Sequence, residues 1–332
     1  YIGIGGTNGF VQVVNLDVSK SKEGKSSGQL SFSQALQYHT DDITLISWND
    51  NFDKLTTCDK SGVIIVWKFI DGKWETEMIN NREQSFVTDL KWNRQGHFLC
   101  FIYEDGHAIV GTVDGNRSWG NDIRNSLYLV EWSPDGNLLL LASKNENIII
   151  LSSSGQQLGE VEIDHTLRET ELASLTWWAK YIDDTKVITK KKHLMLAFIN
   201  GTIALYDDEN DKEPIIFKVN LKKVNKAEWN IDGESFAVSG FINENDDKGV
   251  DSFNNNRKEF VKNIKINEPI RSFAFDAKGT QIAIETPSTI YFGLIKPEYQ
   301  WCYFSDTLVY SFLSDQEHHT VAFWNTKTNT YN

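Results

Sequence analysis

The sequence predicts an all-β fold, a seven-bladed β-propeller whose first blade is truncated at the N-terminus. Apolar, strand-like runs that end in an aromatic residue recur along the 332 residues, and a tight turn follows each run. Their period matches that of a four-stranded propeller blade, which takes about 40–45 residues. No segment longer than two turns shows the 3.6-residue apolar period of a helix.

Aromatic anchors mark the innermost strand of each predicted blade. Successive anchors are 44, 40, 45, 52 and 46 residues apart. The turn after the third anchor is typical, because Pro134 presets φ for a type I turn, Asp135 can bond its own backbone and Gly136 accepts a positive φ. We expect the anchors to be structural side chains that lie beneath these turns. They are Trp48, Trp92, Trp132, Trp177, Trp229 and Phe275.

A third strand is predicted wherever a second turn leads into another β-branched or aromatic run. Continuous apolar runs of this kind mark strands that are buried on both faces, as in blades stacked around an axis. Turn glycines introduce several of them. The predicted third strands span 10–16, 63–69, 107–113, 148–151, 202–206, 260–266 and 289–295, and the turn glycines are Gly9, Gly62, Gly106 and Gly201.

The blade boundaries follow from the anchors and the third strands. Tyr1 falls in the second strand of the truncated first blade, and the polar segments 19–37 and 243–259 are expected to be loops. The remaining blades are predicted at 43–80, 87–119, 127–161, 173–219, 226–266 and 270–312.

The predicted propeller occupies residues 1–318, and residues 319–332 are expected to enter a second propeller. There are eight candidate third strands, the last at 320–326, but only six visible innermost strands. The 24 residues from Ile295 to His319 are mostly taken by the strand-like segment 301–312, which leaves no room for an eighth blade.

Several motifs resemble WD40 repeats. The turn Trp-Ser-Pro-Asp-Gly at 132–136 is one, and strands ending in Ile-Ile-Val-Trp (64–67) and Val-Ala-Phe-Trp (321–324) are others. The second blade comes closest to the pattern. In WD40 families a His, Ser/Thr, Asp and Trp set hydrogen-bonds across a blade, and such a buried network rigidifies the sheet. The resemblance therefore implies a structural network of His39, Thr57, Asp59 and Trp67.

Other stretches depart from the WD40 consensus and resemble a narrower family. They lie at 54–68, 77–82, 103–120 and 290–312. Together they are similar to the N-terminal propeller of the WD repeat-containing protein 35 family, a WD-repeat subunit of intraflagellar transport complex A. In that family two propellers precede a helical solenoid.

The resemblance implies a non-catalytic scaffold or adaptor. Its implied role is retrograde ciliary transport, cilium assembly and trafficking of ciliary membrane cargo, which it would reach through adaptors. The implied partners are other WD-repeat and solenoid subunits of complex A. The implied location is the cilium and its base (the basal body), and the cytoplasm, in association with the cytoskeleton.

The alternative is a WD40 substrate receptor of a ubiquitin ligase, because tubby-like proteins with SOCS-box regions carry a related propeller. An enzyme is a third reading, in which the central channel would hold carboxylates, histidines or metals. The predicted innermost strands offer mainly apolar residues instead.

Composition excludes several function classes. The chain has 33 Lys and Arg against 46 Asp and Glu, a formal net charge of −13, whereas nucleic-acid binding needs a basic footprint. No apolar run approaches the roughly 18 residues of a membrane span.

The three cysteines form no CxxC pair, which favours a reducing compartment. No secretory signal is recognisable, and because the first residue is Tyr1 we expect a piece of a longer protein.

Two glycine-rich motifs fit loops better than catalytic or nucleotide sites. Gly24–Gly28 matches G-x-S-x-G, but a nucleophile elbow needs a strand before it and a helix after it, and here a Ser/Lys/Gly-rich loop surrounds it. Gly3–Gly9 resembles a phosphate-binding loop, yet Asn8 occupies the place of the last required glycine and a strand follows.

We expect no catalytic, metal or cofactor site. His318 and His319 are adjacent on a strand and would point to opposite faces. The acidic segments 207–213 and 244–251 lack the glycine of an EF-hand turn and are expected to be solvated loops. Lys190, Lys191 and Lys192 form the only basic run, which either contacts an acidic partner or anionic membrane or is a solvated hairpin between strands.

Overall fold

The computed structural model describes most of the chain, and the described residues confirm the all-β prediction. They contain no α-helix, and their helical residues are the 3₁₀ turn η1 (Asp50–Phe52) and Leu167, which also has a 3₁₀ conformation. The strands of this part of the chain form eight antiparallel sheets. The described residues are 1–17, 29–82, 85–144, 148–163, 167, 170–183, 186–231, 233, 235–241, 248–254, 259–276, 279–295, 300–313, 319–328 and 330–331.

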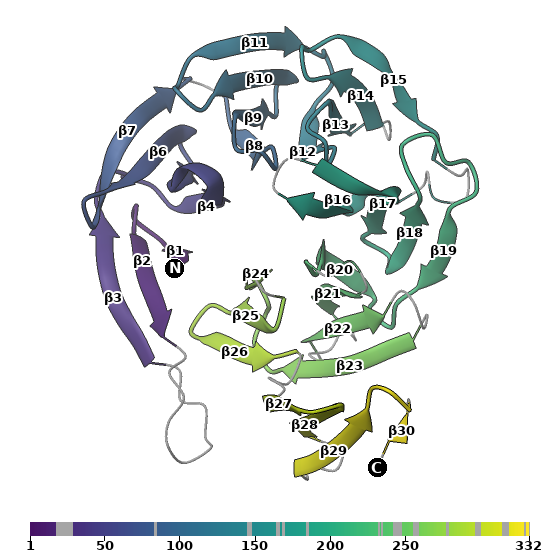
Figure 1. The fold of residues 1–332 in the computed structure, drawn as a ribbon. Helices are drawn as coiled ribbons and strands as arrows, with labels where there is room; N and C mark the ends of the chain where they lie inside the picture. The colour runs from purple at the N-terminus through teal and green to yellow at the C-terminus, as the bar shows by residue number, and fades with distance from the viewer. Residues whose placement is uncertain are drawn as a thin grey trace. The chain divides into compact units, whose positions relative to one another are not determined.

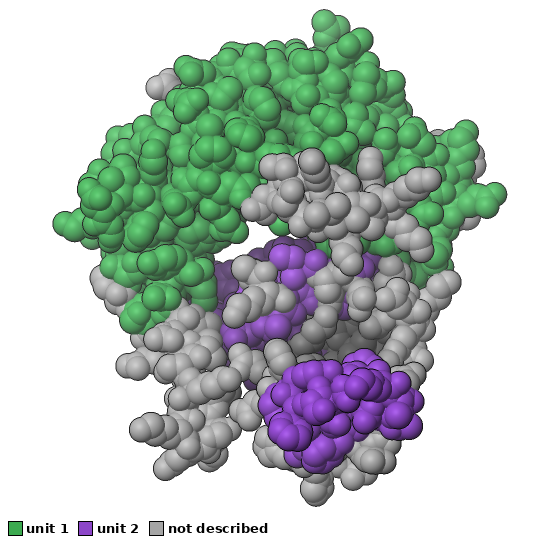
Figure 2. All heavy atoms as spheres, in the orientation of Figure 1, with its two compact units in different colours: residues 1–198, 203–217 green, residues 199–202, 218–332 purple. Residues whose placement is uncertain are grey.

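The first compact unit, residues 1–198 and 203–217, holds five sheets (Figures 1 and 2). In each sheet the strands are ordered as in the sequence, and each pairs antiparallel with the next.

The first sheet has three strands: β1 (Ile2–Gly5), β2 (Val11–Asp17) and β3 (Gln29–Leu36). The second contains β4 (Ile43–Asn49), β5 (Lys54–Asp59), β6 (Val63–Ile70) and β7 (Lys73–Asn81). The third contains β8 (Val87–Trp92), β9 (Phe98–Tyr103), β10 (His107–Thr112) and β11 (Arg117–Asp122). The fourth contains β12 (Leu127–Trp132), β13 (Leu138–Ser143), β14 (Ile148–Ser152) and β15 (Gln157–Val161). The fifth contains β16 (Leu172–Asp183), β17 (Lys186–Phe198), β18 (Thr202–Tyr206) and β19 (Ile215–Lys218).

The apolar cores of this unit lie between successive sheets. Val13 and Leu36 of the first sheet pack with Leu55 and Trp67 of the second. Equivalent clusters join the second sheet to the third, the third to the fourth and the fourth to the fifth. The innermost strands β4, β8, β12 and β16 contact one another in that order, and β1, the first strand of the three-stranded sheet, contacts β4. Sheets that bury both faces against their neighbours in this way explain the continuous apolar runs of the sequence.

Turn glycines hold successive sheets close together. Gly62 and Gly106, which precede the third strands β6 and β10, both have φ of 91°. A Cβ atom on Gly62 would lie 2.8 Å from the carbonyl oxygen of Ser85, at the start of the next sheet. A Cβ atom on Gly106 would lie 2.7 Å from the carbonyl oxygen of Asn125. Only glycine meets both the backbone conformation and this close approach.

The second compact unit, residues 199–202 and 218–332, holds three sheets. A core of Ala237, Ile266, Phe273 and Ile282 packs the first of these sheets against the second. The first contains β20 (Lys223–Trp229), β21 (Ser235–Phe241), β22 (Lys248–Asn254) and β23 (Glu259–Ile266). The second contains β24 (Ser272–Phe275), β25 (Gln281–Glu285) and β26 (Ile290–Leu294). The third contains β27 (Gln300–Phe304), β28 (Thr307–Leu313), β29 (His319–Asn325) and β30 (Thr330–Tyr331).

Three strand assignments from the sequence are wrong. Residues 260–266 belong to a fourth strand, β23, and the third strand is β22, at 248–254, in a segment expected to be a loop. Residues 29–36, also assigned to a loop, form β3 and pair with β2. Polar segments can form strands because the backbone supplies the ladder hydrogen bonds.

The predicted C-terminal boundary of the last blade, 270–312, is also wrong. Residues 300–313 form β27 and β28, and β28 pairs with β29. Within the described residues, all backbone pairing of β27–β30 is among these four strands. The separate sheet therefore begins at Gln300, whereas the sequence placed the start of a new sheet at 319.

Candidate functional site

Four side chains of the second sheet form one buried hydrogen-bonded chain. His39, which precedes β4, places Nδ1 2.7 Å from Oδ2 of Asp59 and Nε2 2.7 Å from Oγ1 of Thr57. The indole N–H of Trp67 donates to Oγ1 of Thr57 at 2.9 Å. The strands β5 and β6 bring these residues together, since Thr57 and Asp59 lie on β5 and Trp67 on its neighbour. These are the four residues that the WD40 resemblance implied.

Every hydrogen bond among these four side chains has a donor and an acceptor if the His39 imidazole is neutral and carries its proton on Nδ1. Trp67 then donates to Thr57, Thr57 donates to Nε2 of His39, and Nδ1 donates to Asp59. Burial by itself would raise the pKa of the Asp59 carboxyl, but hydrogen bonds from Ser61, His39 and the Val63 N–H outweigh it and lower that pKa.

The order Thr57, His39 and Asp59 resembles a catalytic triad in its contacts. Thr57 is fully buried, however, and His39 and Asp59 are 7% and 2% exposed. The Thr57 oxygen already accepts the Trp67 N–H, so a substrate carbonyl cannot reach it. The arrangement stabilises the sheet.

The predicted anchors lie on the strands β4, β8, β12, β16, β20 and β24, at or next to the strand end except for Trp177, which is in the middle of β16. Two of them also tie neighbouring sheets together through the indole N–H. Trp92 donates to Oγ1 of Thr56 in the preceding sheet at 2.9 Å, and Trp132 donates to the carbonyl of Lys91 at 3.0 Å. Trp132 and Trp229 are buried, whereas Trp48, Trp92, Trp177 and Phe275 are partly buried.

A polar residue directly after the anchor repeats this link. The side chain of Asn49 donates to the carbonyl of Gly96, in the turn of the next sheet, at 2.8 Å. Asn230 donates in the same way to Gly279 at 3.0 Å. Both asparagines are 3% exposed or less. No sequence motif predicted these links, although both asparagines stand directly after an anchor tryptophan.

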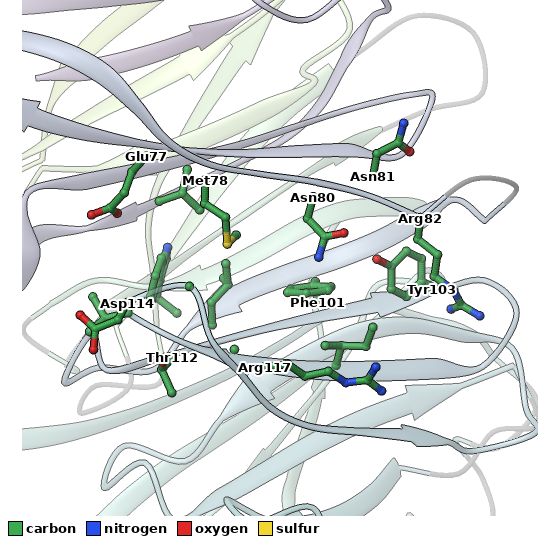
Figure 3. Close-up of a pocket in the computed structure, with 17 residues that line it drawn as sticks. Glu77, Met78, Asn80, Asn81, Arg82, Phe101, Tyr103, Thr112, Asp114 and Arg117 are labelled. Carbon is green, nitrogen blue, oxygen red and sulfur yellow. The ribbon is translucent and has the colours of Figure 1, made fainter.

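A groove of about 420 Å³ opens between the second and third sheets (Figure 3). Its apolar floor is formed by Val66, Met78, Trp92, Leu99, Phe101 and Ile109. Figure 3 shows Glu77 and Asp114 at one end of the groove and Arg82, Tyr103 and Arg117 at the other. The charges of the groove are therefore separated along its length.

The basic end of the groove contains a buried phenol. Tyr103 is fully buried, and its hydroxyl has no hydrogen-bond partner among the described residues. Burial raises the pKa of Tyr103 to about 12, so the hydroxyl is a proton donor at neutral pH. The guanidinium of Arg82 lies 4.9 Å from the ring centroid and is paired with Asp105 at 3.1 Å.

At the acidic end, the carboxylate of Glu77 is held by the buried ammonium of Lys54. Lys54 also donates to the carbonyl of Val113, at 2.6 Å. This lysine therefore ties β5 to both walls of the groove. No motif predicted the groove, although most of its lining comes from the stretches 77–82 and 103–120 that depart from the WD40 consensus.

The remaining sequence motifs are placed as follows. Lys190, Lys191 and Lys192 lie on β17, and their side chains are outside the described residues. Gly24–Gly28 and His318 also lie outside the described part of the chain, as do residues 244–247. Gly3–Gly9 covers the end of β1 and the turn that leads to the strand β2.

The described residues hold no group of three or more His, Cys, Asp or Glu that could bind a metal. Burial raises the pKa of the Cys58 thiol to about 12 and that of Cys100 well above its ordinary value. Both thiols are therefore poor nucleophiles at neutral pH. In the part of the chain that the structure describes, no helix has the length and apolarity needed to traverse a bilayer.

Comparisons with known proteins agree with this architecture. The sequence profile of the family described as WDR35/TULP4 N-terminal matches residues 1–296. The chain is 33% identical over 342 residues to WD repeat-containing protein 35 of Homo sapiens, covering 99% of this chain and 29% of that protein. It is 26% identical over 267 residues to Tubby-related protein 4 of Mus musculus, covering 72% of this chain and 17% of that protein. The chain thus spans less than a third of the length of these curated relatives.

A solved structure supports the fold. The β-propeller domain of Cps50 (Swd1) from Myceliophteria thermophila aligns with a TM-score of 0.60, covering 85% of this chain and 96% of that one. The sequence identity is 13%, so the similarity concerns the fold alone. The predicted β-propeller is confirmed, and the number of blades stays a prediction.

Proposed function

The chain belongs to the WDR35/TULP4 N-terminal propeller family, and from this premise we propose that it is a non-catalytic scaffold of intraflagellar transport complex A. The observation that supports this proposal is the 33% identity to WD repeat-containing protein 35 across 99% of the chain. The proposed activity is the binding of other proteins, in retrograde ciliary transport and in cilium assembly. Its partners would be other WD-repeat and solenoid subunits of the complex, and membrane cargo would be reached through adaptors.

The buried polar groups of the first unit support a scaffold. The His39–Asp59 chain, the Trp92 indole and the Asn49 amide are all used in contacts within or between sheets. A rigid stack of sheets presents loops and sheet edges in fixed positions, which suits a surface that binds several partners. We propose a location in the cilium and at its base, and in the cytoplasm, in association with the cytoskeleton.

The match to Tubby-related protein 4 favours one second candidate, a substrate receptor of a ubiquitin ligase. One experiment distinguishes the two. The full-length protein is tagged in its own cells, and the proteins that co-purify in stoichiometric amounts are identified alongside imaging of the cilium. Complex A subunits and ciliary localisation are expected. Ubiquitin-ligase components in their place would establish the second candidate and contradict the first.

Trp132→Ala is the matched control for folding in this experiment. It removes a buried indole that is 3% exposed, so it is expected to reduce partner recovery through loss of the fold. Exposed substitutions that reduce recovery while the protein stays folded would instead identify contact surfaces.

A further inference from the structure

We propose that the groove between β7 and the β10–β11 hairpin binds an extended peptide segment of a partner protein. The segment would place a large apolar side chain on the groove floor and a carboxylate at the end formed by Tyr103 and Arg117. This inference rests on the proposed scaffold function and specifies the chemistry of one of its partners.

The first observation is the hydroxyl of Tyr103. It is buried without a hydrogen-bond partner among the described residues, which is unfavourable relative to a satisfied hydroxyl. The ring is held by Arg82 on one face and by an edge-to-face contact with Phe101, with centroids 6.0 Å apart. Figure 3 shows the hydroxyl pointing into the groove on the side of Asn80. Because the hydroxyl is fully buried, an acceptor supplied by a ligand would satisfy it only after lining side chains move aside.

The second observation is the guanidinium of Arg117, on the wall opposite β7. This exposed side chain forms no hydrogen bond or ion pair with any described residue. Its positive charge is close enough to Tyr103 to oppose the rise in the pKa of that phenol. A guanidinium and a phenol O–H are both hydrogen-bond donors, and a carboxylate can accept hydrogen bonds from groups of either kind.

The floor of the groove fits an apolar side chain. Phe101 is buried, while Met78 and Ile109 are partly exposed to the cavity. The volume of about 420 Å³ is within the range of ligand pockets, roughly 300–1,000 Å³. Methionine adapts its shape to different partners, which suits a groove that receives a side chain from another protein.

The walls favour an extended peptide. β7 and β11 are the edge strands of their sheets in the described sheet order, so each has backbone groups that no strand of its own sheet pairs. Edge strands of this kind can pair with an added strand through main-chain hydrogen bonds. The backbone of the partner would be held by the walls and its side chains would be selected by the floor and the basic end.

The charges favour a single carboxylate. Arg82 is already paired with Asp105, so Arg117 is the cation of the groove that is left for a ligand among the described residues. Asp114 and Glu77 at the other end would repel a more highly charged anion such as a phosphate. The acidic residue of the partner must therefore lie at the Tyr103 end, with the apolar residue on the floor beside it.

The chain offers a simple test, because it contains two methionines. Met78 lines the groove, and Met195 is fully buried on β17 and serves as an internal control. The chain is labelled with ¹³C at the methionine methyl groups and titrated with capped peptides. Each peptide holds one leucine and one glutamate, separated by glycines of varied number. The expected result is a saturable shift of the Met78 resonance and none of Met195.

Two variants separate binding from folding. Tyr103→Phe removes only the unpartnered hydroxyl, so the unfolding midpoint should stay or rise while peptide affinity falls about tenfold, a change of 1.4 kcal/mol. Arg117→Glu should weaken binding at least as much. Tyr206→Phe and Arg94→Glu make the same chemical changes outside the groove and should leave the affinity unchanged.

Three results would overturn the proposal: no peptide shifts Met78, the glutamine analogue binds as tightly as the glutamate peptide, or Tyr103→Phe retains full affinity. If no peptide binds while complex A subunits still co-purify, the groove proposal fails and the scaffold proposal stands. If Met78 responds but those subunits are absent, the groove proposal stands and the complex A proposal fails.

Discussion

Asp59 is the residue on which the buried polar chain of the second sheet depends. Its carboxylate accepts hydrogen bonds from Ser61 and from the Val63 N–H, in addition to its contact with His39. These contacts stabilise the ionised form in the folded protein. Together with Thr57 and Trp67, they make the sheet rigid at a position where an unpaired polar group would destabilise it.

Asp59→Asn is expected to destabilise the chain by about 1.5–3 kcal/mol at pH 7. Because the pKa of Asp59 is lowered in the folded state, its contribution is fully present above the unfolded pKa of about 3.9 and is lost as the pH falls through the folded value. Urea unfolding at pH 7 and near pH 3 should therefore show the difference between variant and wild type shrinking in acid. A difference that is independent of pH would contradict this assignment.

Trp132 illustrates what an anchor contributes. Trp132→Ala removes a buried side chain and should cost about 3–5 kcal/mol. Trp132→Phe keeps a ring in the site but loses the hydrogen bond to Lys91 and part of the volume, so its cost should be clearly smaller. Denaturant unfolding of both variants measures the loss of stability caused by each substitution. Equal losses, or no loss in the alanine variant, would show that the residue is not an anchor.

At the level of elements, turns fix the spacing between successive sheets. Gly62 and Gly72 both adopt positive φ, of 91° and 83°, in the turns before and after β6. They differ in their surroundings. A Cβ atom on Gly62 would lie 2.8 Å from a backbone oxygen of the next sheet, whereas one on Gly72 would meet nothing within 4 Å.

Gly72→Ala is therefore expected to cost about 1–2 kcal/mol, the strain of a left-handed backbone alone. Gly62→Ala should cost clearly more, because the two sheets must also separate. Thermal unfolding of the two variants under one set of conditions measures the difference. Equal losses would mean that the close contact between the second and third sheets contributes nothing at this turn.

The sequence located the inner parts of the sheets better than their outer parts. Strands such as β6 and β14 are apolar on both faces, so their composition identifies them. The outer strand β7, Lys-Trp-Glu-Thr-Glu-Met-Ile-Asn-Asn, is mostly exposed and polar, and its pairing with β6 depends on backbone hydrogen bonds. For the same reason β22 and β3 were assigned to loops.

The same limit applies to the candidate sites. His39, Thr57, Asp59 and Trp67 follow a known spacing and could be named from the sequence. The groove could not, because Tyr103 and Arg117 are brought to Met78 only by the packing of one sheet against the next. The signal that was present, a departure from the WD40 consensus at 77–82 and 103–120, pointed to the right segments without indicating their contacts.

At the level of the whole molecule, the main question is where one propeller ends. The family match ends at residue 296, and a separate sheet begins at Gln300. The strands β27 to β30 pair only with one another in the described part of the chain. We therefore propose that a second propeller, which the sequence analysis placed at 319, begins near 300.

Truncation tests this boundary. Removing residues 297–332 takes away the whole β27–β30 sheet and should leave cooperative unfolding of the remainder within about 4 °C of the full chain, roughly 1 kcal/mol. Removing residues 316–332 instead leaves the β27–β28 hairpin without its partner β29, and exposes the edge of β28. An isolated hairpin is marginal in water, so this longer variant should be more prone to aggregation and proteolysis than the shorter one. Limited proteolysis and calorimetry of the two variants distinguish a boundary near 300 from one near 319. If the variant that lacks 297–332 loses its cooperative transition while the variant that lacks 316–332 keeps it, β27 and β28 belong to the preceding blade. The boundary then lies near 319.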